Sequence, residues 1–316
     1  MLIYGDDTAG TTNRDYLQQL FDAGQIPCLR EQSTLYVNGT IKLPRKDGYG
    51  RLRTNGADGY PMDPSSLGQV SSRIVQSGSG ELFRVRGAGV FFVEPVELVG
   101  DGTSAAIVVE GNDSPTGPAT GNHTFANLSF RNWGVGIKTV AGYYNDSEVL
   151  QANEVHADNS MIKNCKFFNV GTLFESGNQQ SVNWKIRDCM YSTLSGPTDG
   201  IICDIKRGGC VTLDGLVVNH PQVTVFKVRD YSPHNIQLIC NGLYQDNFNS
   251  ASQYLHILEY YGTGQTIADL KWSLDFTGFT AADQFDSNDL FDIPVDFPTT
   301  NWRYRLLVKD TLVTGP

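Results

Sequence analysis

From residue 127 onward, polar and apolar positions repeat in one pattern: Asn or Asp, two further residues, and then an aromatic residue or Val. Five segments carry the pattern and a sixth is degenerate: 127–130, 164–167, 188–191, 214–217, 241–244 and 273–276. Successive copies are 24 to 37 residues apart. A period of this length predicts a solenoid, because each repeat is one coil whose apolar face is buried only by its neighbours.

The apolar ends of the repeats are expected to form one internal column. Side chains alternate between the two faces of a strand, and equivalent positions of stacked coils lie about 4.8 Å apart. The column should contain Phe130, Phe167, Tyr191, Val217 and Tyr244. The Asn and Asp residues form a second column, at a turn whose backbone favours the left-handed region. The fourth copy departs from the pattern, with Thr212 at an otherwise apolar position and Gly215 after its Asp.

One amphipathic helix is predicted near the N-terminus, over residues 12–24. Thr12 is a candidate N-cap, and Gly24 is suited to end the helix because glycine adopts left-handed backbone without cost. Three apolar residues share one face: Leu17, Leu20 and Phe21. A short helix before a solenoid is expected to cover the exposed core of the first coil.

Short runs of Val, Ile, Phe, Tyr and Thr, separated by Gly, Asn and Asp, predict an all-β protein beyond this helix. Before the repeats, strands are expected near residues 34–44, 73–75, 82–86, 90–93, 96–99 and 105–110. Long loops are expected where turn-forming residues are frequent or a repeat is lengthened, at 45–72, 142–158 and 245–264.

The pattern divides the chain into a cap at 1–24, the solenoid at 25–276 and a C-terminal segment at 277–316. The repeat stops after residue 276, and residues 302–309 are expected to form one strand with an apolar and a basic face. This segment is predicted to cap the far end of the solenoid or to pack against another chain in an oligomer.

Composition and charge narrow the classes of function. The net charge of −10 argues against a nucleic-acid-binding protein, which needs a surplus of Lys and Arg to neutralise phosphates. No run of about 18 apolar residues occurs, so no membrane insertion is expected, and the first residues lack the pattern of a signal peptide. The six Cys and five His show no metal-binding spacing, so no metal or cofactor is expected.

Two cysteines, Cys165 and Cys189, occupy the same position in neighbouring repeats. Two interpretations of this pair stay open. The residues form a column of small buried side chains, or they form a disulfide between coils, which an intracellular origin would disfavour.

The order of the elements is specific enough to indicate a family. A helix at 13–24 leads into a strand at 36–44, and a later coil has the form Asn-x-x-Phe-x-Asn-x-Gly at 164–171. This order resembles the pectate-lyase-like right-handed parallel β-helix superfamily, in particular the β-helix of bacteriophage tailspikes. The resemblance covers most of 12–276. It implies a right-handed parallel β-helix with a short N-terminal capping helix and a C-terminal β cap.

What the resemblance implies about function is a carbohydrate-facing molecule, without fixing its activity. The tailspike type implies a virion protein, often a homotrimer among other virion proteins, that recognises host surface polysaccharide. Three alternatives stay open: the protein also cleaves the glycan as a hydrolase or lyase, it is a non-catalytic structural rod of the virion, or it is a secreted enzyme of cellular origin.

Four aspartates are candidate catalytic residues. Glycoside hydrolysis uses two carboxylates, about 5–5.5 Å apart for retention and about 6.5–9.5 Å for inversion. Asp188 and Asp214 are expected at equivalent positions of adjacent coils; the alternative is that they only continue the Asn column at the turn. Asp199 lies in a Thr-Asp-Gly sequence similar to part of the polygalacturonase-type signature, and Asp204 follows on the opposite strand face.

Glycan-binding residues are expected in an outward basic strip and at aromatic rings. The basic strip consists of Lys185 and Arg187 on one strand face and Lys163 one coil earlier. It is suited to bind uronate or sialate carboxylates or to supply a base; the alternative is an ordinary solvated strand face. Three rings are candidate platforms for sugars or, alternatively, pack loops onto the coil: Trp133, Tyr143 and Tyr144.

Overall fold

The structure is a computed structural model, and it describes most of the chain between residues 9 and 314. The described residues are 9–25, 27–30, 33–43, 51–54, 72–86, 89–92, 95–111, 120–145, 147–151, 157–178, 181–192, 199–219, 222–228, 236–246, 254–260, 272–281, 291–292, 302–308 and 311–314.

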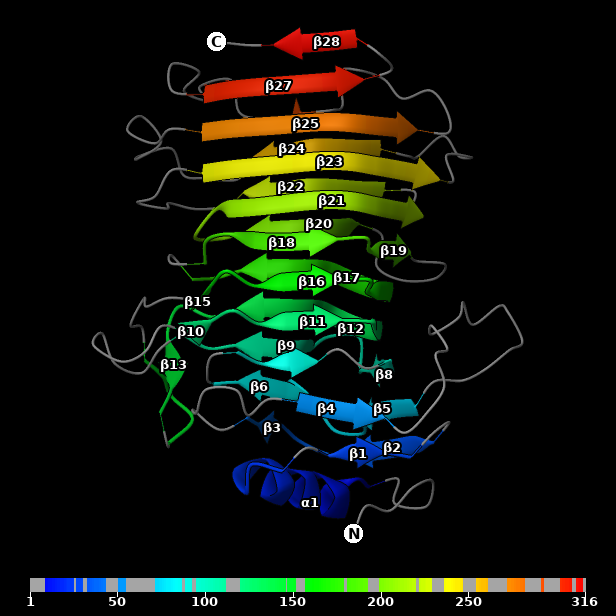
Figure 1. The fold of residues 1–316 in the computed structure, drawn as a ribbon, viewed down its shortest axis with the longest axis vertical. Helices are drawn as coiled ribbons and strands as arrows, with labels where there is room; N and C mark the ends of the chain where they lie inside the picture. The colour runs from blue at the N-terminus through cyan, green and yellow to red at the C-terminus, as the bar shows by residue number, and fades with distance from the viewer. Residues whose placement is uncertain are drawn as a thin grey trace.

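One helix, α1 (Thr11–Asp22), closes the N-terminal end of the molecule (Figure 1). Its three predicted apolar residues are buried or partly buried against the core, which confirms the predicted face. The predicted N-cap Thr12 is wrong: the cap is Gly10, at a left-handed φ of 73°, and no side chain caps the helix. Gly24, with φ 69°, follows the last turn as expected.

Strands make up the rest of the described elements. In chain order they are β1 (Cys28–Leu29), β2 (Thr34–Val37), β3 (Ile41–Lys42), β4 (Arg51–Thr54), β5 (Ser72–Gln76), β6 (Phe83–Val85), β7 (Phe91–Phe92), β8 (Val96–Val99), β9 (Ala105–Val109), β10 (Thr120–Gly121), β11 (Thr124–Ala126), β12 (Leu128–Thr139), β13 (Tyr143–Tyr144), β14 (Leu150–Gln151), β15 (Ala157–Asp158), β16 (Met161–Lys163), β17 (Lys166–Ser176), β18 (Trp184–Arg187), β19 (Met190–Ser192), β20 (Gly200–Ile205), β21 (Cys210–Asn219), β22 (Gln222–Val228), β23 (Ile236–Asp246), β24 (Tyr254–Tyr260), β25 (Trp272–Ala281), β26 (Phe291–Asp292), β27 (Trp302–Val308) and β28 (Thr311–Thr314).

Most of these strands belong to one large sheet of 24 strands whose pairings are almost all parallel. Apart from the antiparallel pair β27–β28, the strands of this sheet pair in parallel with strands from elsewhere in the chain. One row runs β11–β16–β18–β21–β23–β25–β27, and a second runs β9–β12–β17–β20–β22–β24–β26. Figure 1 shows the rows stacked along the long axis, from α1 at one end to β28 at the other. The protein is therefore all-β, with a large sheet of mostly parallel strands, which is consistent with the predicted solenoid.

The internal column is confirmed for the first three copies of the repeat. Phe130 pairs with Phe167, and Phe167 with Tyr191, and all three side chains are fully buried. The Phe130 and Phe167 rings stack with centroids 4.6 Å apart and an interplanar angle of 1°. The Tyr191 hydroxyl donates to the Val170 carbonyl at 2.6 Å, so the one polar group in the column is satisfied.

For the fourth and fifth copies, the predicted register is wrong by one residue. Tyr191 pairs with Val218 rather than Val217. The residues at the left-handed turn are Asn127, Asn164, Asp188, Gly215 and Gly242, with φ between 51° and 70°. Glycine takes this backbone without a Cβ clash, so in an Asp-Gly or Asn-Gly pair the turn falls on the glycine.

This shift exposes two residues that were predicted to be internal. Val217 is 39% and Tyr244 43% exposed, while the flanking Leu216, Val218 and Leu243 are buried. It also resolves the apparent irregularity at Thr212, because the apolar position belongs to Leu213, which is fully buried. Two apolar side chains therefore point outward.

The paired cysteines of the repeat form a buried column. Cys165 and Cys189 lie at equivalent positions of adjacent coils, and both are buried. All six cysteines are free thiols, so the alternative of a disulfide between coils does not hold. Burial raises the pKa of the Cys165 thiol well above its ordinary value, which suits a packing role.

Outside the repeats, strands β5 to β9 lie where the sequence predicted them. Within the predicted loop at 45–72, β4 pairs in parallel with β1 and β7, and most of the other positions lie outside the described residues. Parallel pairing continues past residue 276, since Phe276 pairs with Leu306 of the predicted C-terminal strand. The division into a solenoid and a C-terminal cap stays a prediction. No helix in the described part of the chain is long and apolar enough to span a bilayer.

Candidate functional site

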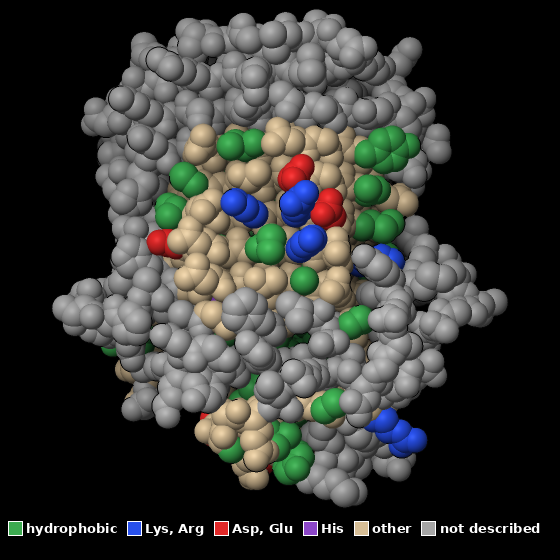
Figure 2. All heavy atoms as spheres, viewed as in Figure 1, with side chains coloured by type: hydrophobic (Ala, Val, Ile, Leu, Met, Phe, Trp, Pro, Cys, Tyr) green, Lys and Arg blue, Asp and Glu red, His purple; other side chains and the backbone are tan. Residues whose placement is uncertain are grey.

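The strongest candidate site lies on the outer surface of the strand row β11–β16–β18–β21. Figure 2 shows Lys and Arg side chains gathered with acidic ones at the centre of the described area of this face. The basic strip belongs to this row: Lys163 on β16 pairs with Arg187 on β18, and Lys185 stands two positions before Arg187 on the same strand. Sequence alternation and parallel stacking thus bring the three predicted cations together.

Arg187 lies between the two aspartates that were predicted to form a catalytic pair. Its Nε is 3.4 Å from a carboxylate oxygen of Asp188 and 3.4 Å from one of Asp214. The predicted alignment of the two aspartates is wrong, because Asp214 pairs with Arg187 and Asp188 faces Gly215. All three side chains are about half exposed, so each keeps edges free for a ligand.

The two lysines of the strip differ from Arg187. Among the residues that the structure describes, neither Lys163 nor Lys185 has a carboxylate within salt-bridge distance, and Lys185 is exposed. On a protein with a net charge of −10, two neighbouring lysines that have no acidic partner among the described residues concentrate positive charge at this point of the surface. Such a surface attracts an anionic group.

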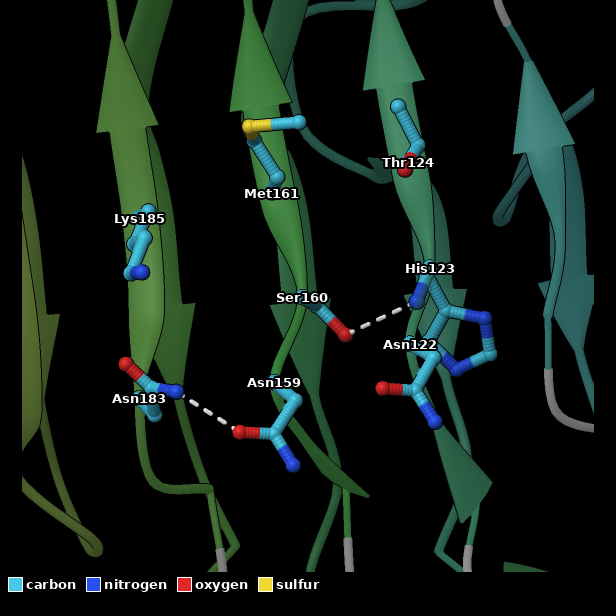
Figure 3. Close-up of a pocket in the computed structure, with 8 residues that line it drawn as sticks. All are labelled: Asn122, His123, Thr124, Asn159, Ser160, Met161, Asn183 and Lys185. Carbon is cyan, nitrogen blue, oxygen red and sulfur yellow. Dashed lines mark hydrogen bonds between the residues drawn. The ribbon is translucent and has the colours of Figure 1, made fainter.

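A groove of about 410 Å³ adjoins the strip and shares Lys185 with it (Figure 3). One side is formed by an amide ladder, Asn122, Asn159 and Asn183, three exposed residues in the left-handed turns that precede β11, β16 and β18. Asn183 Nδ2 donates to Asn159 Oδ1 at 2.7 Å. The next outward row, Thr124–Met161–Lys185, runs beside the ladder. Carboxamides, a hydroxyl and an ammonium therefore line three consecutive coils.

Two buried residues, His123 and Ser160, also line the groove. The His123 Nδ1 accepts a hydrogen bond from the Val90 N–H at 3.2 Å, which places the ring proton on Nε2. Burial lowers the His123 pKa to about 3, so the ring is neutral at physiological pH. Ser160 Oγ accepts from the His123 N–H and donates to the Asp158 carbonyl. These residues hold the turns in place, and Lys185 is the cation among the groove's lining residues.

The other predicted catalytic residues lie away from this surface. Asp204 is on β20 in the second strand row, 2% exposed, and pairs in register with Glu175 and Lys227. Asp199 is exposed, just before the same strand. The structure therefore does not bring Asp199 or Asp204 together with Asp188 and Asp214.

Trp133 was predicted as a sugar platform, and this expectation is wrong. The ring is 1% exposed within the core, and its Nε1–H donates to the Leu98 carbonyl at 2.9 Å. A ring enclosed on both faces has no surface on which a sugar can stack. A Cβ added at Gly100 would lie 2.3 Å from the indole, so the glycine leaves room for the ring.

The two tyrosines of the lengthened repeat lie in the hairpin β13–β14, which folds back onto the coil. Tyr144 is half-buried, with the Arg84 guanidinium 4.0 Å from its ring centroid. Glu148 at the other end of the hairpin forms ion pairs with Arg84 and Lys42. The Tyr144 ring therefore packs this loop onto the coil, and Tyr143 is also only partly exposed.

Sequence reasoning missed the amide ladder, although a signal was present. Asn122, Asn159 and Asn183 each stand five residues before the turn residue of their own coil. It also missed Tyr244, because the register error placed this ring inside. No group of three His, Cys, Asp or Glu side chains suited to hold a metal ion occurs in the described ranges.

Comparison with protein-family models, with curated proteins and with solved structures finds no match for this chain. The function of the chain is therefore inferred from its own residues and their geometry.

Proposed function

We propose that this chain is a right-handed parallel β-helix of the pectate-lyase-like type that binds host surface polysaccharide, as a tailspike-type protein of a bacteriophage virion. Two features support the fold assignment: the order of capping helix and Asn-rich coils in the sequence, and the parallel stacking of those coils. The virion location, the homotrimer and contacts with other virion proteins rest on the resemblance to tailspikes.

One observation carries the binding proposal: the basic strip adjoins a groove lined by an amide ladder on an otherwise acidic protein. Carboxamides donate and accept hydrogen bonds, as the hydroxyls of a sugar require. Lys163 and Lys185 supply positive charge without an acidic partner among the described residues, and Arg187 adds a planar fork suited to carboxylates. We therefore propose an acidic glycan, with uronate or sialate units, as the ligand class.

The same geometry favours binding over cleavage. A hydrolase keeps the space between its two carboxylates for the scissile bond or a water molecule. Here the Arg187 guanidinium occupies the space between Asp188 and Asp214. Held in this way, the aspartates are suited to accept hydrogen bonds from sugar hydroxyls.

The proposal is tested by binding to polygalacturonate, polysialate and the neutral polymer dextran. The variant combines Lys163→Gln with Lys185→Gln, and the control is Lys138→Gln, a lysine on β12 in the second strand row. Exposed charge pairs contribute about 0.2–1 kcal/mol each, so each lysine is expected to account for up to about fivefold in Kd.

We expect wild type and the control to bind an acidic polymer in preference to dextran, with affinity that falls as salt rises. The double variant should bind more weakly. Equal binding by the double variant and the control would remove the basic strip from the site, and no binding to any acidic polymer would contradict the function itself.

A further inference from the structure

An apolar strip crosses three coils next to the basic strip. Met190 pairs with Val217, and Val217 with Tyr244, so the three side chains line up along the stacking direction. Val217 and Tyr244 are among the few large apolar side chains exposed in the described residues. Figure 2 shows hydrophobic side chains in a line along one edge of the described face.

The apolar strip is exposed because the core beneath it is already full. Leu216, Val218 and Leu243, which flank the exposed residues on their strands, point inward and are buried. Side chains alternate along a strand, so Val217 and Tyr244 must point outward in this register. Single exposed apolar residues are ordinary, but an aromatic ring in register with two further apolar side chains forms a surface suited to a ligand.

The apolar strip and the charged groups share one surface. Met190, Val217 and Tyr244 each stand three residues after a polar residue of the adjoining row, with the left-handed turn between them. These polar residues are Arg187, Asp214 and Asn241. A row of hydrogen-bonding groups thus runs beside a row of apolar ones across the same coils.

This pairing of rows fits a sugar chain better than it fits a second copy of the protein. A pyranose ring has an apolar C–H face and an edge of hydroxyls, so one ring can cover Tyr244 and still satisfy the neighbouring polar groups. A stable protein interface needs about 800 Å² per partner, and it would have to remove the half-exposed Arg187, Asp188 and Asp214 from water at a cost. Hydroxyls can replace that water.

We propose that the glycan site extends across the turn onto the apolar strip, with Tyr244 as the ring on which a sugar stacks. This inference rests on the proposed function and adds a specificity-determining residue to it. The site then selects sugars that combine an acidic group with an unobstructed C–H face.

The test compares Tyr244→Ala with Tyr244→Phe, which keeps the ring, and with Val149→Ala, an exposed apolar residue on the hairpin segment. The probes are polygalacturonate and polysialate. Loss of one stacked ring is expected to weaken binding by about 3- to 10-fold. Tyr244→Phe and Val149→Ala should bind as wild type, and the loss in Tyr244→Ala should persist in high salt, unlike the loss in the lysine variant.

Three outcomes would overturn the inference, and they are distinguishable. If Tyr244→Ala binds as wild type while the lysine variant binds weakly, the apolar strip is outside the site and the proposed function stands. If wild type binds neither acidic polymer, the proposed function fails and this inference fails with it. If Tyr244→Ala changes the sedimentation coefficient but not polymer binding, the strip is an interface between copies. Tyr244→Gln, a second ring deletion, repeats the test should Tyr244→Ala fold poorly.

Discussion

Replacing Gly215 by Ala should destabilise the protein, because Gly215 rather than Asp214 occupies the left-handed turn of its coil. Its φ is 66°, and a Cβ there would lie 3.1 Å from Asp188 Oδ1, the end of a side chain that can move. The cost is therefore mostly that of left-handed backbone in a residue with a Cβ, about 1–2 kcal/mol. For a chain of 316 residues, that corresponds to a fall in Tm of roughly 1.5–3 °C.

The assay is thermal unfolding of wild type, Gly215→Ala and Gly215→Asn, followed by circular dichroism. Asn is the matched control, since Asn127 and Asn164 hold the same position of their coils at φ 59° and 51°. The Asn variant should lie between Ala and wild type. A Gly215→Ala protein as stable as wild type would refute the assigned register and restore the turn to Asp214.

Three further predictions concern the packing of the core and two titratable side chains. Tyr191→Ala should lower the free energy of unfolding by about 3–5 kcal/mol, because it leaves a cavity in the core. Tyr244→Ala should change it by no more than about 0.5 kcal/mol in the same assay, because this ring is exposed. Equal losses in the two variants would contradict the assigned register. Burial lowers the His123 pKa to about 3, from about 6.5 in the unfolded chain. Between these two pH values the unfolded state binds a proton that the folded state does not, so the free energy of unfolding should decrease as pH falls from about 6.5 to about 3. His123→Asn, which can still accept from the Val90 N–H, should flatten that slope, and an unchanged slope would show that His123 is not its source. Desolvation raises the Glu148 pKa, but hydrogen bonds from Lys42 and Arg84 outweigh it, and the net pKa is lowered. The ionised carboxylate therefore stabilises the hairpin at a pH above the pKa that Glu148 has in the unfolded chain. This stabilisation is lost as pH falls through the lowered pKa of the folded state. Faster hydrogen exchange in strands β13 and β14 is expected in Glu148→Gln, and unchanged exchange would show that the ion pairs of Glu148 do not hold the hairpin.

The coil could be predicted from the sequence because its two main signals are local. Asn at a left-handed turn and an aromatic residue three positions later each report on the backbone and burial of a single coil. Phe130, Phe167 and Tyr191 stack as predicted for this reason. The predicted register of the fourth copy was wrong because the sequence is ambiguous there. Either Asp214 or Gly215 is suited to the turn, and either Val217 or Val218 could be the buried apolar residue. Only pairing with the previous coil decides between them.

The site was predicted less completely than the coil. Lys163, Lys185 and Arg187 could be placed together because they alternate on one strand face and repeat on the next. The sequence pattern could not show that Arg187 lies between two carboxylates, since this depends on the shifted register. Trp133 shows another limit: a large ring with one polar group serves equally well in a core and on a surface, and composition does not distinguish the two.

The central claim is that an acidic glycan binds over the basic strip and the groove beside it. Lysine-reactive footprinting with mass spectrometry tests this most directly, with the wild-type protein labelled alone and in the presence of polygalacturonate or polysialate. We expect an acidic polymer to protect Lys163 and Lys185 and to leave Lys138 as reactive as before, whereas dextran should protect none of the three. Two results would contradict binding at the basic strip. One is protection of Lys138 while the labelling of Lys163 and Lys185 stays unchanged, and the other is equal protection of the lysines by dextran.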